Sequence, residues 1–141
     1  MLKMNVASVQ FPQSKSGDDR LALVRAVAHV LASDGWAEIR AQHCPEYRDP
    51  QAVVVPELNV PLQPDVCASH PARPAPLLAC VGSPAELHEP SIGRRWQALA
   101  AWAAHHGAAF AVFIQPRDYA RASAIAARWH IDADHLRTLP H

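Results

Sequence analysis

The residues with the clearest potential for chemistry lie in the stretch LQPDVCASHPARPAPLLACVGSPAEL, residues 62–87. Asp65 follows Pro64 in an extended segment, and an apolar run, residues 77–81, comes after a turn broken by prolines. A carboxylate on one strand can share a divalent cation with an acid on the neighbouring strand. Because the second run reads Leu-Leu-Ala-Cys-Val, the pattern supplies only one of the two acids that such a site needs.

The elements that would position Asp65 can be predicted from periodicity and from capping signals. Residues 1–15 are predicted to be an irregular or strand-like lead. Ser16 and Asp19 form a capping-box pattern, and the apolar residues after them recur at helical spacing as far as Leu31, before Gly35 ends the helix. Residues 36–42 alternate in part and predict a strand.

The middle of the chain is rich in proline, which excludes a long helix between Pro45 and Pro90. Strands are predicted there at 53–55, 66–68 and 77–81, the last covered on both faces. Ser83-Pro84-Ala85-Glu86 is typical of a helix start. The remaining predicted elements are a helix over 92–106, a strand over 110–114, a helix over 119–129, and a short strand over 136–139 within a tail, 131–141.

This order predicts a single α/β domain over residues 1–141. An antiparallel hairpin comes first, and a right-handed crossover through the 92–106 helix leads to a parallel strand. We expect a sandwich of three layers, with a mixed central sheet and helices on both faces.

The chain resembles the PD-(D/E)XK nuclease superfamily, which has the restriction-endonuclease-like fold. The resemblance covers roughly residues 18–131 and depends on Pro64-Asp65, on SPAEL at 83–87, on Arg95-Trp96, and on the apolar strand AAFAVFI. It implies that Asp65 matches the first carboxylate of a Mg²⁺ site. The second acid would fall at about Ala79 and the lysine at about Val81, and neither side chain can bind a cation or transfer a proton.

The resemblance leaves one way to restore the site, since an acid in the following helix, Glu86 or Glu89, could replace the missing carboxylate. The lysine has no such substitute, because the chain has none after Lys15 and an arginine stays protonated. We therefore expect a catalytically inactive nuclease-like protein, with Asp65 as a remnant of the metal site, Glu86 as a helper, and no cofactor. It would act as a nucleic-acid-associated or protein-interaction module.

Two alternatives stay open at this stage. One is an active, Mg²⁺-dependent nuclease that uses Asp65 with Glu86 or Glu89. The other is a structural or regulatory homodimer without a nucleic-acid role, which a low charged fraction of 18% favours. Lys+Arg and Asp+Glu are both 13, so net charge gives no general attraction to nucleic acid or to an anionic membrane. We expect a cytoplasmic protein without a membrane segment.

The cysteines, histidines and tryptophans allow further hypotheses. If the hairpin turns at Arg73, Cys67 and Cys80 would face each other, and a zinc or copper site with His43, Cys44 or His70 is conceivable. Buried free thiols and scattered surface histidines are the simpler interpretation.

Trp96 and Trp129 fall on apolar helix faces and are predicted to be core residues. Trp102 lies to one side of its helix and is a candidate interface residue.

Overall fold

The computed structural model describes residues 5–55 and 60–140, with side chains placed for 19–54 and 61–140. In chain order the helices and strands are α1 (Asn5–Ser33), β1 (Ala37–Ala41), β2 (Val53–Val55), β3 (Val60–Leu62), β4 (Val66–His70), β5 (Arg73–Val81), α2 (Ser91–His105), β6 (Ala109–Ile114), α3 (Tyr119–Arg128) and β7 (Leu136–Thr138). Three short 3₁₀ helices lie between them: η1 (Glu86–His88), η2 (Pro116–Asp118) and η3 (Ala133–His135).

The central sheet is mixed and has five strands in the order β1-β4-β5-β6-β7. The pairs β1–β4 and β4–β5 are antiparallel, whereas β5–β6 and β6–β7 are parallel. The crossover from β5 to its parallel neighbour β6 runs through α2, as the sequence predicts. The predicted α/β class and the mixed sheet are confirmed.

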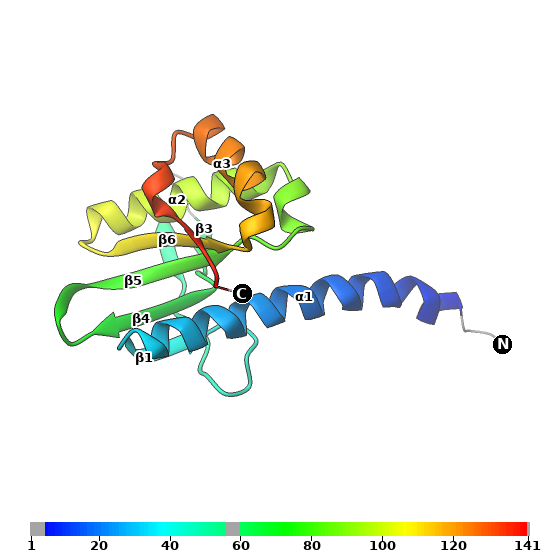
Figure 1. Ribbon diagram of the computed structural model, residues 1–141, viewed down its shortest axis with the longest axis horizontal. Helices are drawn as coiled ribbons and strands as arrows, with labels where there is room; N and C mark the ends of the chain where they lie inside the picture. Colours follow the sequence, from blue (N-terminus) through cyan, green and yellow to red (C-terminus); the bar gives the residue numbers. More distant parts are fainter. Residues whose placement is uncertain (1–4, 56–59, 141) are drawn as a thin grey trace.

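The helices cover both faces of this sheet (Figure 1). On one face, α1 packs Val24, Val27 and Leu31 against sheet residues that include Val66 and Phe113. On the other face, buried residues of α2 and α3 pack against alternate sheet residues, which include Leu78, Cys80, Phe110, Val112 and Ile114. Successive residues of β5 and β6 therefore enter opposite cores, which explains why both segments are continuous apolar runs.

The N-terminal prediction was wrong for the part of the lead that the structure describes. Residues 5–15 belong to α1, which begins at Asn5, and the capping pattern from Ser16 to Asp19 lies inside the helix. Residues 1–4 are outside the described residues. A capping box adds hydrogen bonds where a helix starts, but it does not prevent a helix from continuing in the N-terminal direction. The other end was predicted correctly, because Gly35 adopts φ +90° just after the last turn.

The proline-rich region is non-helical apart from η1 over its described residues, 45–55 and 60–90, as expected. The predicted strand at 53–55 exists, but it pairs with β3 in a separate two-stranded ribbon and not with the main sheet. The predicted helix start at Ser83 leads only to the short η1, whose N-cap is Ala85. The Ser83 hydroxyl donates to Glu86 Oε1 at 2.8 Å, and the Glu86 backbone amide approaches Ser83 Oγ at 3.4 Å.

The register of the β4–β5 hairpin corrects the cysteine prediction. Cys67 pairs with Leu78, and Val66 pairs with Ala79, so Cys80 is not opposite Cys67. The register shifts between Ala68 and His70, which moves the hairpin away from the symmetric turn at Arg73. Cys80 is buried on the α2 face, and all three cysteines are free thiols.

Candidate functional site

Asp65 lies immediately before β4 and is completely buried. Its backbone amide donates to the Ala79 carbonyl at 3.0 Å, and its own carbonyl accepts from the Gln42 amide at 2.8 Å. These bonds fix the residue between β5 and the end of β1. The predicted closeness of the Asp65 segment to the 77–81 strand is thereby confirmed.

The two positions that the resemblance assigns to an acid and a lysine lie beside Asp65 but carry only hydrocarbon. Ala79 and Val81 are fully buried in the core beneath α1. Val81 still contacts the carboxylate, because its backbone amide donates to Asp65 Oδ2 at 2.8 Å. The backbone of the second strand thus reaches Asp65, whereas its side chains supply no oxygen or amine.

Two arginines from opposite faces of the sheet bind the Asp65 carboxylate. Arg20 of α1 donates through Nη2 to Asp65 Oδ1. Arg95 of α2 makes a forked interaction, with Nη2 at 3.2 Å from Oδ1 and Nη1 at 3.4 Å from Oδ2. Both guanidinium side chains are about three-quarters covered, with 24% and 23% of their surface exposed. Two cationic groups and one amide therefore surround this single buried carboxylate.

Glu86 joins the same group through Arg20, whose Nε lies 3.2 Å from Glu86 Oε2. The other carboxylate oxygen accepts from the Ser83 hydroxyl, so Ser83 holds Glu86 in place. Glu89, the other acid considered from the sequence, is exposed and lies in a surface groove beside Trp129. Of the two candidates for a replacement acid, the structure brings only Glu86 toward Asp65, and it does so with an arginine between them.

Two glutamines extend the group. Gln42 accepts from Arg20 Nη2 at 2.9 Å and donates to Gln63 Oε1 at 2.6 Å, and Gln63 donates in turn to the Pro50 carbonyl at 2.6 Å. Arg95 Nη2 also donates to the Gln63 carbonyl. We call Asp65, Glu86, Arg20, Arg95, Gln42 and Gln63 the Asp65 network. Its two carboxylates and two guanidinium groups balance in charge, as a buried ionic cluster must.

The pKa values of nearby groups reflect burial within this network. Burial raises the pKa of the Cys80 thiol to about 12, with Arg95 at 3.5 Å acting in the opposite direction. For Arg95, burial alone lowers the pKa, but the negative charges of Asp65 and Glu86, joined by that of Cys80 once it ionises, outweigh burial and raise the pKa above its ordinary value. Cys80 is therefore a neutral thiol, and Arg95 remains a cation, at neutral pH.

The donor set does not fit a Mg²⁺ ion. Such an ion needs several oxygen ligands in near-octahedral geometry, and here guanidinium nitrogens occupy the directions in which the Asp65 oxygens would bind it. Across the described residues, no three His, Cys, Asp or Glu side chains come together as a metal-binding group, and the imagined zinc or copper set of Cys67, Cys80, His43, Cys44 and His70 is not assembled.

The partners of Asp65 were not predicted, yet the sequence contains a signal for both. Arg20 lies four residues before Val24 and seven before Val27, which puts it on the apolar face of α1. Arg95 lies three residues after Ile92 and four before Leu99, on the buried face of α2. An arginine on a buried helix face needs an acid partner, since unpaired charges are almost never buried.

The tryptophan predictions have mixed outcomes. Trp96 is fully buried, and Trp129 packs against the same core while remaining partly exposed, which confirms both as core residues. Trp102 is partly buried and stacks on His106 with ring centroids 4.0 Å apart. Its role at an interface stays a prediction.

Comparisons with family models, with curated proteins and with solved structures find no match to this chain. Within the described part of the chain, none of the helices combines the length and the apolar character that crossing a membrane requires.

Proposed function

We propose that this protein is a catalytically inactive, nuclease-like α/β domain that binds nucleic acid. The observation that carries the proposal is the state of Asp65: the carboxylate that the resemblance matches to a metal ligand is buried and bound to two arginines. The arginines neutralise the charge that would otherwise attract a cation. What remains is a structural ion network in the place of a cutting centre.

The loss of catalysis follows from the groups that are missing. Phosphodiester hydrolysis by this kind of site needs a metal to activate water and to neutralise the charge that develops on the phosphate. A positioned acid or base contributes about 10²–10⁴-fold on its own, and Ala79 and Val81 can supply neither. In the competing hypothesis, Asp65 and Glu86 together hold a metal, which requires that Arg20 leaves both carboxylates.

A surface on α2 and α3 supports the binding role. Arg94, Arg121 and Arg128 are exposed there. Arg94 lies over the Trp129 ring at 5.9 Å from its centroid, and Arg121 Nη1 lies 3.3 Å from His88 Nδ1. We call Arg94, Arg121, Arg128, His88 and Trp129 the helical arginine patch. Glu89 lines the groove beside Arg128 and Trp129, and Asp118 lies at the N-cap of α3. Arginines with an aromatic ring are typical of phosphate and base contacts.

Cleavage assays test the inactive state. The full chain is incubated with plasmid DNA and with single-stranded DNA in Mg²⁺ or in Mn²⁺, and we expect no cleavage above the buffer control. Turnover that is lost in both Asp65→Ala and Glu86→Gln would establish the active alternative. Glu86→Gln is included because it keeps the Ser83 contact and is the milder change to the fold.

Binding assays test the nucleic-acid role. Anisotropy of labelled single-stranded and duplex oligonucleotides is measured at two salt concentrations, and affinity is expected to fall steeply with salt. Replacing Arg94, Arg121 and Arg128 with Gln should lower the salt slope by about 2–3. A matched control replaces Arg48, Arg73 and Arg137, which are exposed elsewhere, and should leave the slope nearly unchanged.

The same binding assays distinguish the nucleic-acid-binding domain from the third hypothesis, a homodimer without a nucleic-acid role. Absence of binding at low salt, together with a dimer in sedimentation analysis, would favour a structural or regulatory homodimer. In that case Trp102→Ala is the variant to examine, because Trp102 is the residue predicted to lie at an interface.

A further inference from the structure

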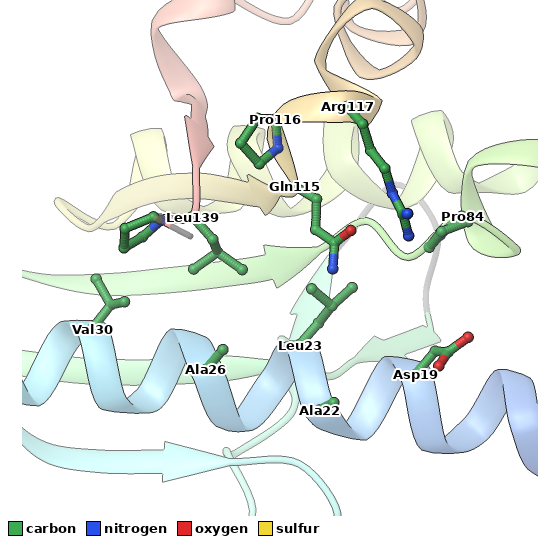
Figure 2. A pocket seen from close by; sticks show the side chains of 11 residues that line it. Asp19, Ala22, Leu23, Ala26, Val30, Pro84, Gln115, Pro116, Arg117 and Leu139 are labelled. Atoms are coloured by element: carbon green, nitrogen blue, oxygen red, sulfur yellow. The ribbon is translucent and has the colours of Figure 1, made fainter.

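A cavity of about 490 Å³ lies between α1 and the ends of three parallel strands. It is lined by Pro84 after β5, by Gln115 to Arg117 after β6, and by Leu139 after β7 (Figure 2). The carboxyl ends of adjacent parallel strands are where open α/β sheets bind ligands. The volume falls in the range of small-molecule sites. The Asp65 network contributes no side chain to the lining.

One end of the cavity carries two opposite charges. Asp19 reaches in from α1 and Arg117 from the loop after β6, and Figure 2 shows both near Pro84. Both residues are exposed, and neither takes part in an ion pair with another described residue. An acid and a base that face one space without pairing with each other can each bind the opposite charge of a single ligand.

The middle of the cavity is occupied by a polar amide. Gln115 is partly buried, and Figure 2 shows its side chain pointing from the end of β6 toward Leu23 of α1. It makes no side-chain hydrogen bond to the residues whose side chains are placed. A primary amide has two donors and one acceptor, so it can contact either charged group of a ligand.

The opposite end is hydrocarbon. Ala26, Val30 and Leu139 line it, with Leu23 beneath Gln115. Asp19 and Val30 are 11 residues apart on α1, which corresponds to about 16 Å along the helix axis. The charged end and the apolar end are therefore well separated, and the cavity is amphipathic along its length.

We propose that this cavity binds a hydrophobic amino acid with a free ammonium and a free carboxylate group. The ammonium group binds Asp19, the carboxylate binds Arg117, and Gln115 contacts the head group from above. The apolar side chain lies along Leu23 and extends toward Ala26 at the start of the apolar end. One positive and one negative residue at the same end select a zwitterion over a simple anion or cation, since either of these would leave one charge without a partner.

Three probes with the same apolar tail test the assignment: L-phenylalanine, 3-phenylpropionate, which lacks the ammonium group, and 2-phenylethylamine, which lacks the carboxylate. Binding to the full chain is measured by calorimetry or by ligand-detected NMR. Phenylalanine should bind about tenfold more tightly than either single-charge probe, as expected when a charged hydrogen bond is lost.

Variants assign each charge. Arg117→Gln should weaken phenylalanine and 3-phenylpropionate about tenfold and leave 2-phenylethylamine within about twofold. Asp19→Asn should weaken phenylalanine and 2-phenylethylamine about tenfold and leave 3-phenylpropionate within about twofold. Arg48→Gln, at an exposed arginine outside the cavity and outside the helical arginine patch, is the matched control and should change nothing. Ala26→Leu, which fills the apolar end, should weaken all three probes. Circular dichroism confirms that each variant is folded.

The proposal is overturned if phenylalanine does not bind at millimolar concentration, or if its binding is insensitive to both charge variants. It is also overturned if guanosine monophosphate, tested in parallel, binds with the same dependence on Asp19 and Arg117 while phenylalanine does not. Because DNA binding is assigned to the helical arginine patch, these outcomes do not depend on the nuclease-like proposal.

Discussion

Asp19 and Arg20 are neighbours in sequence on α1, but they belong to two regions with opposite electrostatic character. Arg20 enters the Asp65 network, where every charge has a partner and the carboxylate is excluded from solvent. Asp19 faces the amphipathic cavity, where it and Arg117 lie exposed without ion pairs to other described residues. Adjacent helical positions point about 100° apart, which sends the two side chains to different places.

The difference separates stability from binding. A buried charge that loses its partner is costly, so the Asp65 network cannot exchange a guanidinium for a metal ion without a large penalty. An exposed charge beside a cavity is hydrated and can exchange water for a ligand at small cost. The residues that look most like a catalytic centre therefore stabilise the fold, and the less conspicuous pair is available for recognition.

The sharpest test of this comparison removes Asp65 itself. Asp65→Ala leaves Arg20 and Arg95 facing each other without their shared acid, and we expect it to lower the free energy of unfolding by about 3–5 kcal/mol. Urea denaturation measures the loss. Asp34→Ala replaces an exposed acid just after the C-terminal end of α1 and should change the free energy of unfolding by less than about 0.5 kcal/mol. A small effect at Asp65 would mean that the network is not structural.

A smaller loss of stability is expected when an arginine of the Asp65 network, Arg20, is replaced, and Arg117 of the cavity provides the comparison. Arg20→Met should cost about 1–3 kcal/mol, because Asp65 loses one of its two cationic partners while Arg95 remains. The partial exposure of Arg20 keeps the loss below that of Asp65→Ala. Arg117→Met removes the same charge from the cavity and should cost less than about 0.5 kcal/mol. Equal losses for the two variants, measured by urea denaturation, would abolish the distinction.

Much of the fold could be predicted, because local signals determine it. The apolar runs at 77–81 and 110–114 predicted strands covered on both faces, and Gly35 and Gly107 marked helix ends, where both adopt positive φ. The start of α1 was missed because a capping pattern identifies a permitted helix start and not the only one. The β2–β3 ribbon was missed because strand partners depend on tertiary packing.

The site was predicted in part for a similar reason. Asp65 and Glu86 were singled out from motif positions, and the structure brings both into one network. The two arginines that bind Asp65, Arg20 and Arg95, lie 45 and 30 residues away from it in the sequence. Pairing over such sequence distances leaves no local pattern. The position of each arginine on an apolar helix face was the available clue. The cavity depends on residues from α1 and three strand ends, which only the folded chain brings together.

The pH dependence of Cys80 gives a third test, of how fully solvent is excluded from the region around Asp65. Its pKa is about 12 because it is buried, against an ordinary value of 9.0. The folded protein therefore keeps a proton that the unfolded chain releases, so stability is fully present below pH 9 and falls as pH rises toward 12. By pH 10 we expect a loss of about 1 kcal/mol that is absent in Cys80→Ala. Urea denaturation at pH 8 and pH 10 under reducing conditions measures it, and parallel losses in both proteins would show that Cys80 is accessible when folded.

The exposed pair Arg25–Glu46 should give the smallest effect and serves as the reference for an ion pair outside the network. Arg25 donates to both Glu46 oxygens, at 2.8 and 3.1 Å, and this hydrogen bonding lowers the pKa of Glu46 below 4.5. A lowered pKa in the folded state means that the contribution is present above pH 4.5 and is lost as pH falls through the folded value. Glu46→Gln should therefore match the wild type in acid and differ slightly at pH 7. Since solvent screens this pair, the difference should vanish in high salt, whereas the loss in Asp65→Ala should persist. A salt-resistant Glu46 effect as large as that of Asp65→Ala would show that enclosure is not what makes the Asp65 network strong.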